Sequence, residues 1–198
     1  MQQNNYNITT NKSLKMKRLN IFLLCISMSV SGYSQVFRTG ETLKRGVFSL
    51  GVEPAVFING GSEFMLFFHG GYGIKNGIDL ALKFGIGNPN YFGADLEWKL
   101  ANRISLTTGA HNFGDFGLDA GLNFTIPIKS DVKLYTGFDS DIVFSEDENG
   151  DAEILYPLWI PIGVEIALQK KMSMILESEI GITDPAYHVI GGGLNFYF

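Results

Sequence analysis

The chain has 198 residues, enough for one domain, and only 18% of them are charged, while Gly is frequent and 13% are aromatic. This composition suits a sheet protein with many turns and disfavours a bundle of long helices. Apart from the four basic residues within positions 1–34, 11 Lys and Arg stand against 20 Asp and Glu, a net charge of −9. That balance argues against nucleic acid as a partner, which would need a basic patch.

The first 34 residues have the pattern of a secretory signal peptide. The basic stretch KSLKMKRLN precedes the apolar IFLLCISMSV, and small residues follow at Gly32 and Ser34. Because the apolar run is too short to span a membrane, we expect cleavage after Ser34 and a mature chain that starts at Gln35. Met16 begins a shorter leader, MKRLNIFLL, and is the alternative start to the first methionine. Cys25 leaves with this leader, so no disulfide is expected.

A short lead at 35–46, expected in the periplasm, comes before a series of strand-like segments. Ten stretches of about ten residues, separated by turn residues, alternate apolar and polar side chains with the period of two that is typical of strands. No apolar stripe with a helical period competes with them after residue 46. The stretches are 47–58, 64–74, 78–87, 91–100, 103–112, 116–128, 132–144, 155–168, 172–182 and 186–198.

The alternation gives every stretch an apolar face and a polar face, and two architectures produce such a pattern. A soluble sandwich or small soluble barrel would bury the apolar face, whereas a transmembrane barrel would turn it towards lipid. Three features favour the transmembrane barrel. The polar face is rich in Gly and Ala, the stretches have the roughly 9–11 residues that a tilted strand needs to cross a bilayer, and aromatic residues lie near their ends.

The connections between the stretches fall into two sets that alternate along the chain. One set, INGGSE, GNPN, HNFGDF, SEDENGDAE and TDPAY, contains no Lys or Arg, whereas the members of the other, KNG, LANR, IKSD and QKK, are short and basic. Successive strands of an antiparallel barrel run in opposite directions, so the two sets lie at opposite ends. The pattern matches longer outer loops and short periplasmic turns, and it predicts ten strands, with eight as the alternative.

The chain ends in the alternating sequence LNFYF. With the leader and the ten stretches, this ending resembles the small outer-membrane β-barrels of Gram-negative bacteria. The resemblance implies an all-β, closed antiparallel up-and-down transmembrane barrel over 47–198 in the bacterial outer membrane, with its lipids as partners. It also implies that the barrel-insertion machinery reads Leu194, Phe196 and Phe198 as an assembly signal. The last strand is expected to pair with the first, because an open edge in hydrocarbon would leave backbone groups unsatisfied.

The polar face predicts an acidic lumen. Fourteen charged residues fall on it, and acids exceed bases ten to four. Two interpretations stay open: a packed interior of ion pairs with acids at wet rims, or a narrow, water-containing path for cations or small solutes. The lumen candidates are Glu53, Asp79, Lys83, Asp95, Glu97, Asp119, Asp139, Asp141, Glu165, Glu177 and Glu179, joined by Lys99, Arg103 and Lys133.

The eighth stretch, 155–168, contains Pro157 and Pro161, each of which removes a ladder hydrogen bond. We therefore expect bulges at these prolines. Trp159 lies between them and points inward in the predicted register, where it would plug or line the lumen.

No catalytic, metal or cofactor site is expected. Omptin-like proteases have ten strands with an acidic pair and an Asp/His pair, and Asp139 and Asp141 share a face here, but His188 falls on the lipid-facing set. His69 and His111 have no Ser at a spacing that predicts an acyl-transfer site. The acidic SEDENGD departs from EF-hand spacing. The alternative to a channel is a structural or surface-recognition barrel that acts through its acidic outer loops.

Overall fold

The computed structural model describes residues 41–58, 61–147 and 149–198. The predicted signal peptide at 1–34, with the alternative start at Met16, and residues 35–40 of the lead lie outside the described residues. All regular structure in the described ranges is β. In that part of the chain no helix has the length and apolar character needed to cross a membrane.

The strands follow the predicted stretches closely. They are β1 (Phe48–Ile58), β2 (Ser62–Lys75), β3 (Ile78–Ile86), β4 (Tyr91–Ala101), β5 (Ile104–Phe113), β6 (Asp115–Pro127), β7 (Val132–Glu146), β8 (Ala152–Leu155), β9 (Leu158–Gln169), β10 (Met172–Gly181) and β11 (His188–Tyr197). The exception is the eighth predicted stretch, 155–168: it corresponds to β9 and the last residue of β8, while Ala152 and Glu153 of β8 lie in the predicted loop SEDENGDAE.

The two parts, β8 and β9, form one interrupted strand along β7. Both pair with β7 in a continuous register, and between them the Asp141 N–H donates to the Pro157 carbonyl at 3.1 Å. Pro157 lies in the interruption because proline has no N–H to donate. Pro161 lies inside β9 opposite Glu179, and the pairing does not shift there. The expectation of bulges at the two prolines is therefore wrong.

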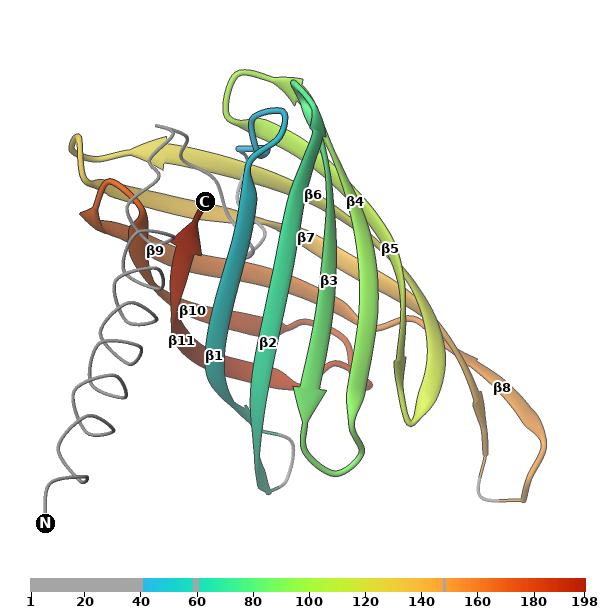
Figure 1. Cartoon of the computed structure of the whole chain (residues 1–198). Helices are drawn as coiled ribbons and strands as arrows, with labels where there is room; N and C mark the ends of the chain where they lie inside the picture. The colour runs from blue at the N-terminus through green and yellow to red at the C-terminus, as the bar shows by residue number, and fades with distance from the viewer. Residues whose placement is uncertain (1–40, 59–60, 148) are drawn as a thin grey trace, which may run out of the picture. The chain divides into compact units, whose positions relative to one another are not determined.

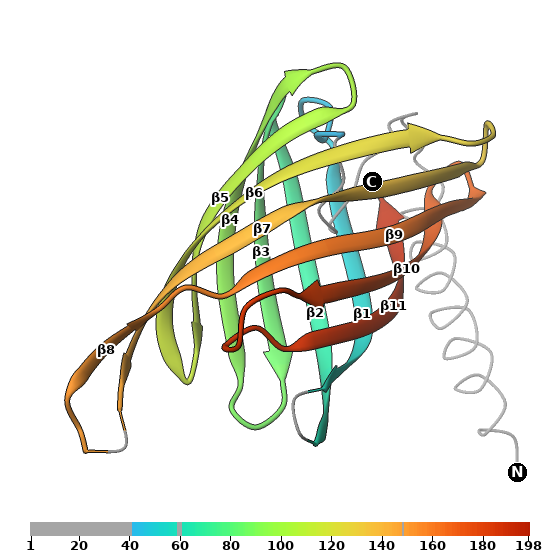
Figure 2. The same ribbon diagram turned by 180° about the vertical axis from the view of Figure 1, so that it is seen from behind.

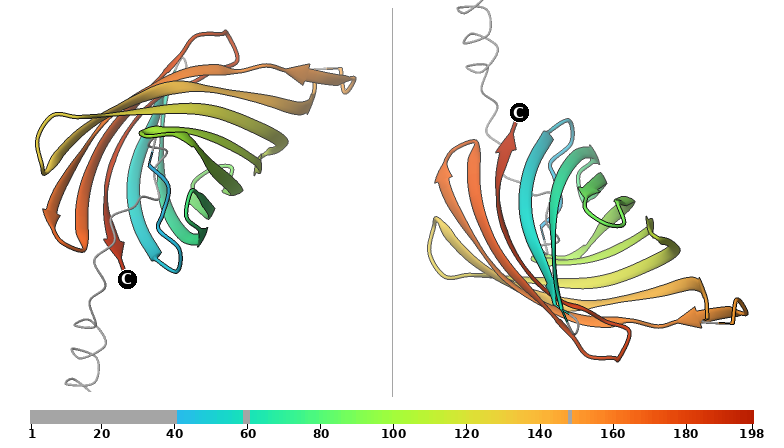
Figure 3. Two further views of the ribbon diagram at one scale, coloured as in Figure 1. Left: turned by 90° about the horizontal axis from the view of Figure 1, so that it is seen from above. Right: turned by 90° about the horizontal axis from the view of Figure 1, so that it is seen from below.

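The sheet closes on itself. Every described neighbour is antiparallel, β1 pairs with β11 so that Leu50 lies opposite Phe196, and β6 pairs with β7. Counting β8 and β9 as one strand gives a closed ring of ten, which confirms the predicted barrel. Figures 1 and 2 show the strands tilted against one another, and Figure 3 shows the sheet curving round in the views from above and below. Tilt of this kind is what closure requires.

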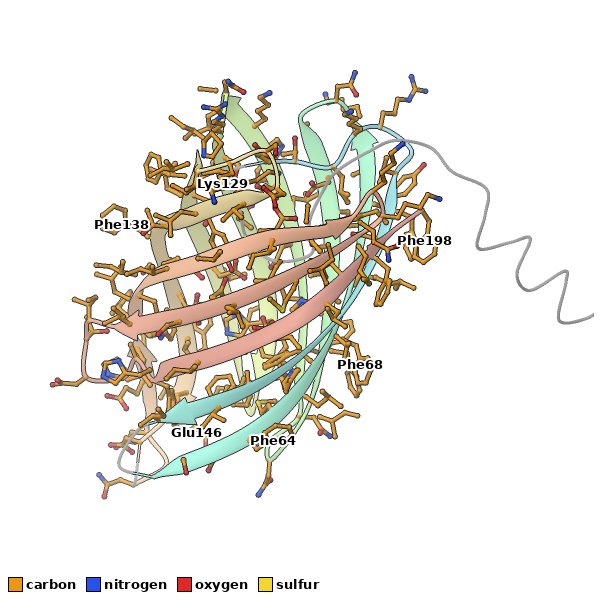
Figure 4. The ribbon with its side chains drawn as sticks, turned by 90° about the vertical axis from the view of Figure 1, so that its left-hand side faces the viewer. Phe64, Phe68, Lys129, Phe138, Glu146 and Phe198 are labelled. Carbon is orange, nitrogen blue, oxygen red and sulfur yellow. The ribbon has the colours of Figure 1, made fainter. Side chains whose placement is uncertain are left out.

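The burial of the barrel is inverted relative to a water-soluble domain. Large apolar side chains cover the outside, and Figure 4 shows Phe64, Phe68 and Phe138 pointing away from the strands. The inside contains polar side chains, including buried carboxylates. The exposed apolar residues include Phe48, Leu50, Phe64, Phe68, Leu82, Phe84, Phe92, Phe116, Leu118, Phe138, Ile142, Ile162, Leu176, Ile190, Leu194 and Phe196.

Glycine on the inner face makes room for large lumen side chains. A Cβ on Gly163 would overlap the ring of Tyr135, which is completely buried. In the same way, a Cβ on Gly117 would overlap the imidazole of His111. The small residues of the polar face therefore allow bulky groups from adjacent strands to lie flat across the interior.

The two ends of the barrel differ. The end formed by 75–77, 101–103, 128–131 and 169–171 (the turn end) has tight turns, with a positive φ of 83° at Gly77 and 68° at Arg103. The opposite end (the loop end) bears the longer connections, and the hairpin of β7 and β8 extends beyond the other strands there (Figures 1 and 2). Figure 4 shows Lys129 and Glu146 at these opposite ends.

Candidate functional site: the barrel interior

The lumen candidates lie on the inner face of the barrel. Lys83, Glu177 and Glu179 are partly buried, whereas Lys99 and Arg103 are exposed at the turn end. Placement at odd-numbered positions explains the orientation, because side chains of one parity share a face of a strand. The buried carboxylates are Glu53, Asp79, Asp95, Glu97, Asp119, Asp139, Asp141 and Glu165.

Two lysines pair with interior carboxylates. The Lys83 Nζ lies 2.7 Å from the Asp95 Oδ2 across β3 and β4. At the turn end, the Lys133 Nζ lies 2.6 Å from the Glu41 Oε2 and 3.4 Å from the Glu165 Oε2. These pairs compensate charges that would otherwise be costly away from bulk water.

Each interior histidine lies beside a carboxylate. The His69 Nε2 is 3.1 Å from the Glu53 Oε2. The His111 Nδ1 and Nε2 are 3.6 and 3.5 Å from carboxylate oxygens of Asp119 and Asp141. Spacing along the sequence did not indicate these pairings, because the partners come from other strands, β1 for His69 and β6 and β7 for His111, which only the folded sheet brings together.

A packed layer crosses the barrel interior between its two cavities, on the turn-end side of the strands (the middle layer: Thr107, Asn123, Tyr135, Ser173, Ile175 and Tyr197). All six side chains are buried, and Tyr135 and Ile175 have no exposed surface. The Tyr135 hydroxyl donates to the Glu177 Oε2 at 2.6 Å, and the Asn123 Nδ2 donates to the Thr107 Oγ1 at 3.0 Å. Cavities lie on either side of this layer and share no lining residue.

The turn-end cavity, of about 550 Å³, is partly closed by the lead. Leu43 is only 1% exposed, and its N–H donates to the Asp79 Oδ2 at 2.6 Å. The Gly46 N–H donates to the Gly73 carbonyl at 2.8 Å. Residues 41–47 therefore fold into the end of the barrel, a feature that the sequence pattern did not reveal.

The loop-end cavity, of about 480 Å³, is strongly acidic. Among the described residues that line it, seven are Asp or Glu, whereas Lys83 is the single lysine and two are histidines. The seven acids are Glu53, Glu63, Asp115, Asp139, Asp141, Glu177 and Glu179. Acidic side chains in the lining therefore exceed lysines by six.

Aromatic rings form a second part of the same cavity (the aromatic wall: Phe57, Phe67, Tyr91, Phe113 and Tyr187). Phe57 is central, with ring centroids 6.0, 5.5 and 6.3 Å from those of Phe67, Phe113 and Tyr187. Tyr91 packs against Phe67 at 5.4 Å. Sequence reasoning missed this wall, although the odd positions of its members place them on the polar face.

Trp159 also lines the loop-end cavity, consistent with its expected inward orientation. Its Nε1 donates to the Tyr187 carbonyl at 2.7 Å, which ties β9 to the connection between β10 and β11.

The protease-like residues do not come together as a catalytic set. Asp139 and Asp141 line the loop-end cavity, whereas His188 is exposed and its Nδ1 accepts a hydrogen bond from the Gly181 N–H at 3.1 Å. Over the described ranges, no group of three or more His, Cys, Asp and Glu side chains is arranged to hold a metal ion.

The acidic loop after β7 organises its own backbone. The Asp147 Oδ1 accepts N–H hydrogen bonds from Asp151 and Asn149, both at 2.8 Å. These bonds, that from Asp151 first, hold the pKa of the Asp147 carboxyl below its usual value.

No family model matches this chain, and no curated protein matches it in sequence. Among solved structures, it is similar to the NanC porin, with 12% identity over 74% of this chain and 98% of that one and a TM-score of 0.48. It is also similar to the translocator domain of the autotransporter NalP from Neisseria meningitidis, with 7% identity, 97% of both chains covered and a TM-score of 0.46. A de novo designed transmembrane β-barrel shares 10% identity over 78% of this chain and 98% of its own, with a TM-score of 0.43.

Proposed function

We propose that the protein is an integral outer-membrane β-barrel without catalytic activity, whose loop-end cavity collects cations for a narrow path through the lumen. The observation that supports the cation preference is the excess of six acidic side chains over lysine around one cavity of about 480 Å³. Carboxylates lining a cleft with walls of low dielectric constant concentrate cations, and rings of such groups favour cations in channels.

The membrane location rests on the inverted burial. Phe64, Phe92 and Leu176 are 62%, 59% and 53% exposed, and similar side chains surround the barrel. A water-soluble protein rarely exposes so continuous an apolar surface, whereas lipid contact removes its cost. Closure leaves no open edge in hydrocarbon. These observations support outer-membrane lipids as partners.

The final strand supports the proposed assembly signal. Leu194 and Phe196 are exposed on β11, and Phe198 is 49% exposed. β11 is the C-terminal strand, and its pairing with β1 closes the ring. We infer that the barrel-insertion machinery reads these three side chains before that pairing forms.

Passage beyond the loop-end cavity requires the middle layer to open. Tyr135 has no exposed surface, and its hydroxyl binds Glu177 at the boundary of the acidic cavity. A solute that moves towards the turn end must displace this ring and then meet the docked lead. The proposed path is therefore narrow and gated, which suits small ions rather than large solutes.

The mature chain, 35–198, refolded into a planar bilayer under a salt gradient, tests this function. We expect discrete current steps with a cation-selective reversal potential, and weaker selectivity in the double variant Glu177→Gln/Glu179→Gln. The matched control Glu146→Gln/Glu153→Gln changes two acids at the exposed end of the β7–β8 hairpin and should leave selectivity unchanged. A silent barrel with intact sheet by circular dichroism would overturn the path.

A second function, recognition of a surface partner, is favoured by the β7–β8 hairpin. It extends beyond the barrel and bears the acids Glu146, Asp151 and Glu153. Binding to cells or matrix that disappears with the Glu146→Gln/Glu153→Gln control, in a barrel that is silent in bilayers, would support this alternative.

A further inference from the structure

We propose that the loop-end cavity is a binding site for an organic cation, a substituted ammonium group with an apolar body. The inference rests on the proposed function, because it takes the cavity to face the outer medium and names the class of solute that it selects. The cavity volume of about 480 Å³ lies within the range of about 300–1,000 Å³ that is usual for small-molecule sites. A bare inorganic ion would leave most of this space to water.

The aromatic wall and four of the seven acids come from different sides of the ring. The rings are on β1, β2, β4, β5 and the connection after β10, whereas Asp139 and Asp141 are on β7 and Glu177 and Glu179 on β10. In a ring of ten strands in this order, β7 lies across from β2 and β10 across from β4. A ligand in the cavity therefore has the rings on one side and these four carboxylates on the other, while Glu53 and Glu63 lie on the strands that carry Phe57 and Phe67.

This combination selects against inorganic ions. Aromatic faces attract cations through their quadrupole and also cover alkyl groups, but they cannot replace the oxygen ligands that a strongly hydrated ion loses. Substituted ammonium ions are weakly hydrated and carry apolar substituents. Phe57, Phe67 and Tyr91 would contact those substituents, while the carboxylates balance the charge.

Glu177 and Glu179 are the carboxylates that the protein leaves for a ligand. Lys83, which lines the same cavity, pairs with Asp95, and Lys133 at the turn end pairs with Glu165. Across the described residues, no Lys, Arg or His lies within ion-pairing distance of Glu177 or Glu179. The hydrogen bond from Tyr135 orients the Glu177 carboxyl group but brings no positive charge to it. A cationic ligand would supply the missing charge.

Trp159 provides a direct reporter, because it lines the cavity and the chain contains only one other tryptophan, Trp98 on β4. In a Trp98→Phe background, the full chain is refolded in a nonionic detergent, since phosphocholine detergents carry the same ammonium group. The protein is titrated with choline, with its uncharged isostere 3,3-dimethylbutan-1-ol, and with KCl at matched ionic strength. We expect a saturable change in Trp159 emission with choline alone.

Two variants separate the two sides of the site. Glu177→Gln/Glu179→Gln should weaken choline binding at least about tenfold, as loss of charge partners for a desolvated cation predicts, while Glu146→Gln/Glu153→Gln should not change it. Phe57→Leu keeps an apolar side chain but removes a ring, and should weaken binding by about 2- to 30-fold, the equivalent of one cation–π contact.

The outcomes distinguish this inference from the proposed function. A cation-selective barrel whose Trp159 emission responds equally to choline and to the isostere, or to neither, overturns the organic-cation site and leaves the path intact. Saturable choline binding in a barrel that carries no current supports the site and overturns transport. The comparison of choline with its isostere needs no variant of the site itself, so a folding defect in Phe57→Leu leaves that test unaffected.

Discussion

Replacing Leu43 by Ala should release the lead from the turn end of the barrel. Leu43 is 1% exposed, and truncating such a buried leucine costs about 2–5 kcal/mol. Because the change affects only the docked state of the lead, that free energy shifts the equilibrium between docked and released forms. At a factor of ten for about each 1.4 kcal/mol, the released fraction should rise by roughly 30- to 4,000-fold.

Limited trypsin digestion measures this fraction. Cleavage after Lys44 or Arg45 requires local opening, since the Arg45 N–H binds the Asn76 Oδ1 at 3.3 Å and the next residue binds the Gly73 carbonyl. When opening is faster than cleavage, the rate follows the open population. The new N-terminus is quantified by mass spectrometry in the refolded barrel, so that cuts in other turns are counted separately.

The control is Leu50→Ala, the same substitution on the outer face of β1, where the side chain is 45% exposed and makes no contact with the lead's docking site. Its cleavage after position 44 or 45 should stay close to the wild-type rate. Equal acceleration in both variants would show that the barrel as a whole had loosened. An unchanged rate for Leu43→Ala would refute the idea that this side chain holds the lead in place.

Two further predictions concern the lumen and the outer loop. Gly163→Ala should lower the free energy of unfolding by about 1–3 kcal/mol, because the added methyl group overlaps the ring of Tyr135. The control is Gly70→Ala, whose Cβ meets no atom nearer than 3.9 Å. Urea unfolding in micelles measures the free energy of unfolding of both variants. The N–H hydrogen bonds from Asp151 and Asn149 lower the pKa of the Asp147 carboxyl below 3.8, so the loop should keep its order as pH falls through 3.8 and lose it only when this carboxyl is protonated. The amide chemical shift of Asp151 measures this order. Loss of order already above pH 3.8 would contradict the prediction.

The barrel itself could be predicted from local pattern. The period of two fixes which side chains share a face, and turn residues fix where strands end, so the bounds of nine of the ten predicted stretches differ from single strands by only a few residues. The eighth stretch failed because Pro157 interrupts the pairing without shifting it. The presence of a proline alone does not distinguish a gap in a ladder from a bulge, since either accommodates the missing N–H.

The contents of the lumen were less predictable because they depend on partners distant in sequence. The Glu41 and Lys133 side chains meet across 92 positions, and the Leu43 N–H meets Asp79 across 36. The lead has no alternation of apolar and polar residues from which such contacts could be predicted. The odd positions of the aromatic wall place it on the inner face, so parity alone could have predicted it. Aromatic residues in a barrel pattern also indicate girdles at the membrane interface, however. A position near a strand end does not show whether Phe57 and Phe67 line the lumen or belong to such a girdle.

The two cavities differ in the balance of acidic and basic side chains that line them. The loop-end lining has seven acids and one lysine, whereas the turn-end lining has three acids, Glu41, Asp131 and Glu165, against four Lys and Arg. Under the proposed function, a cation would be drawn into the loop end and would meet no comparable attraction beyond the middle layer. Release at the turn end would be favourable once Tyr135 moves, because the basic groups there repel the arriving charge. Under the same proposal, anions would be repelled at the acidic loop-end cavity, so we expect a barrel opened by loss of the lead still to prefer cations.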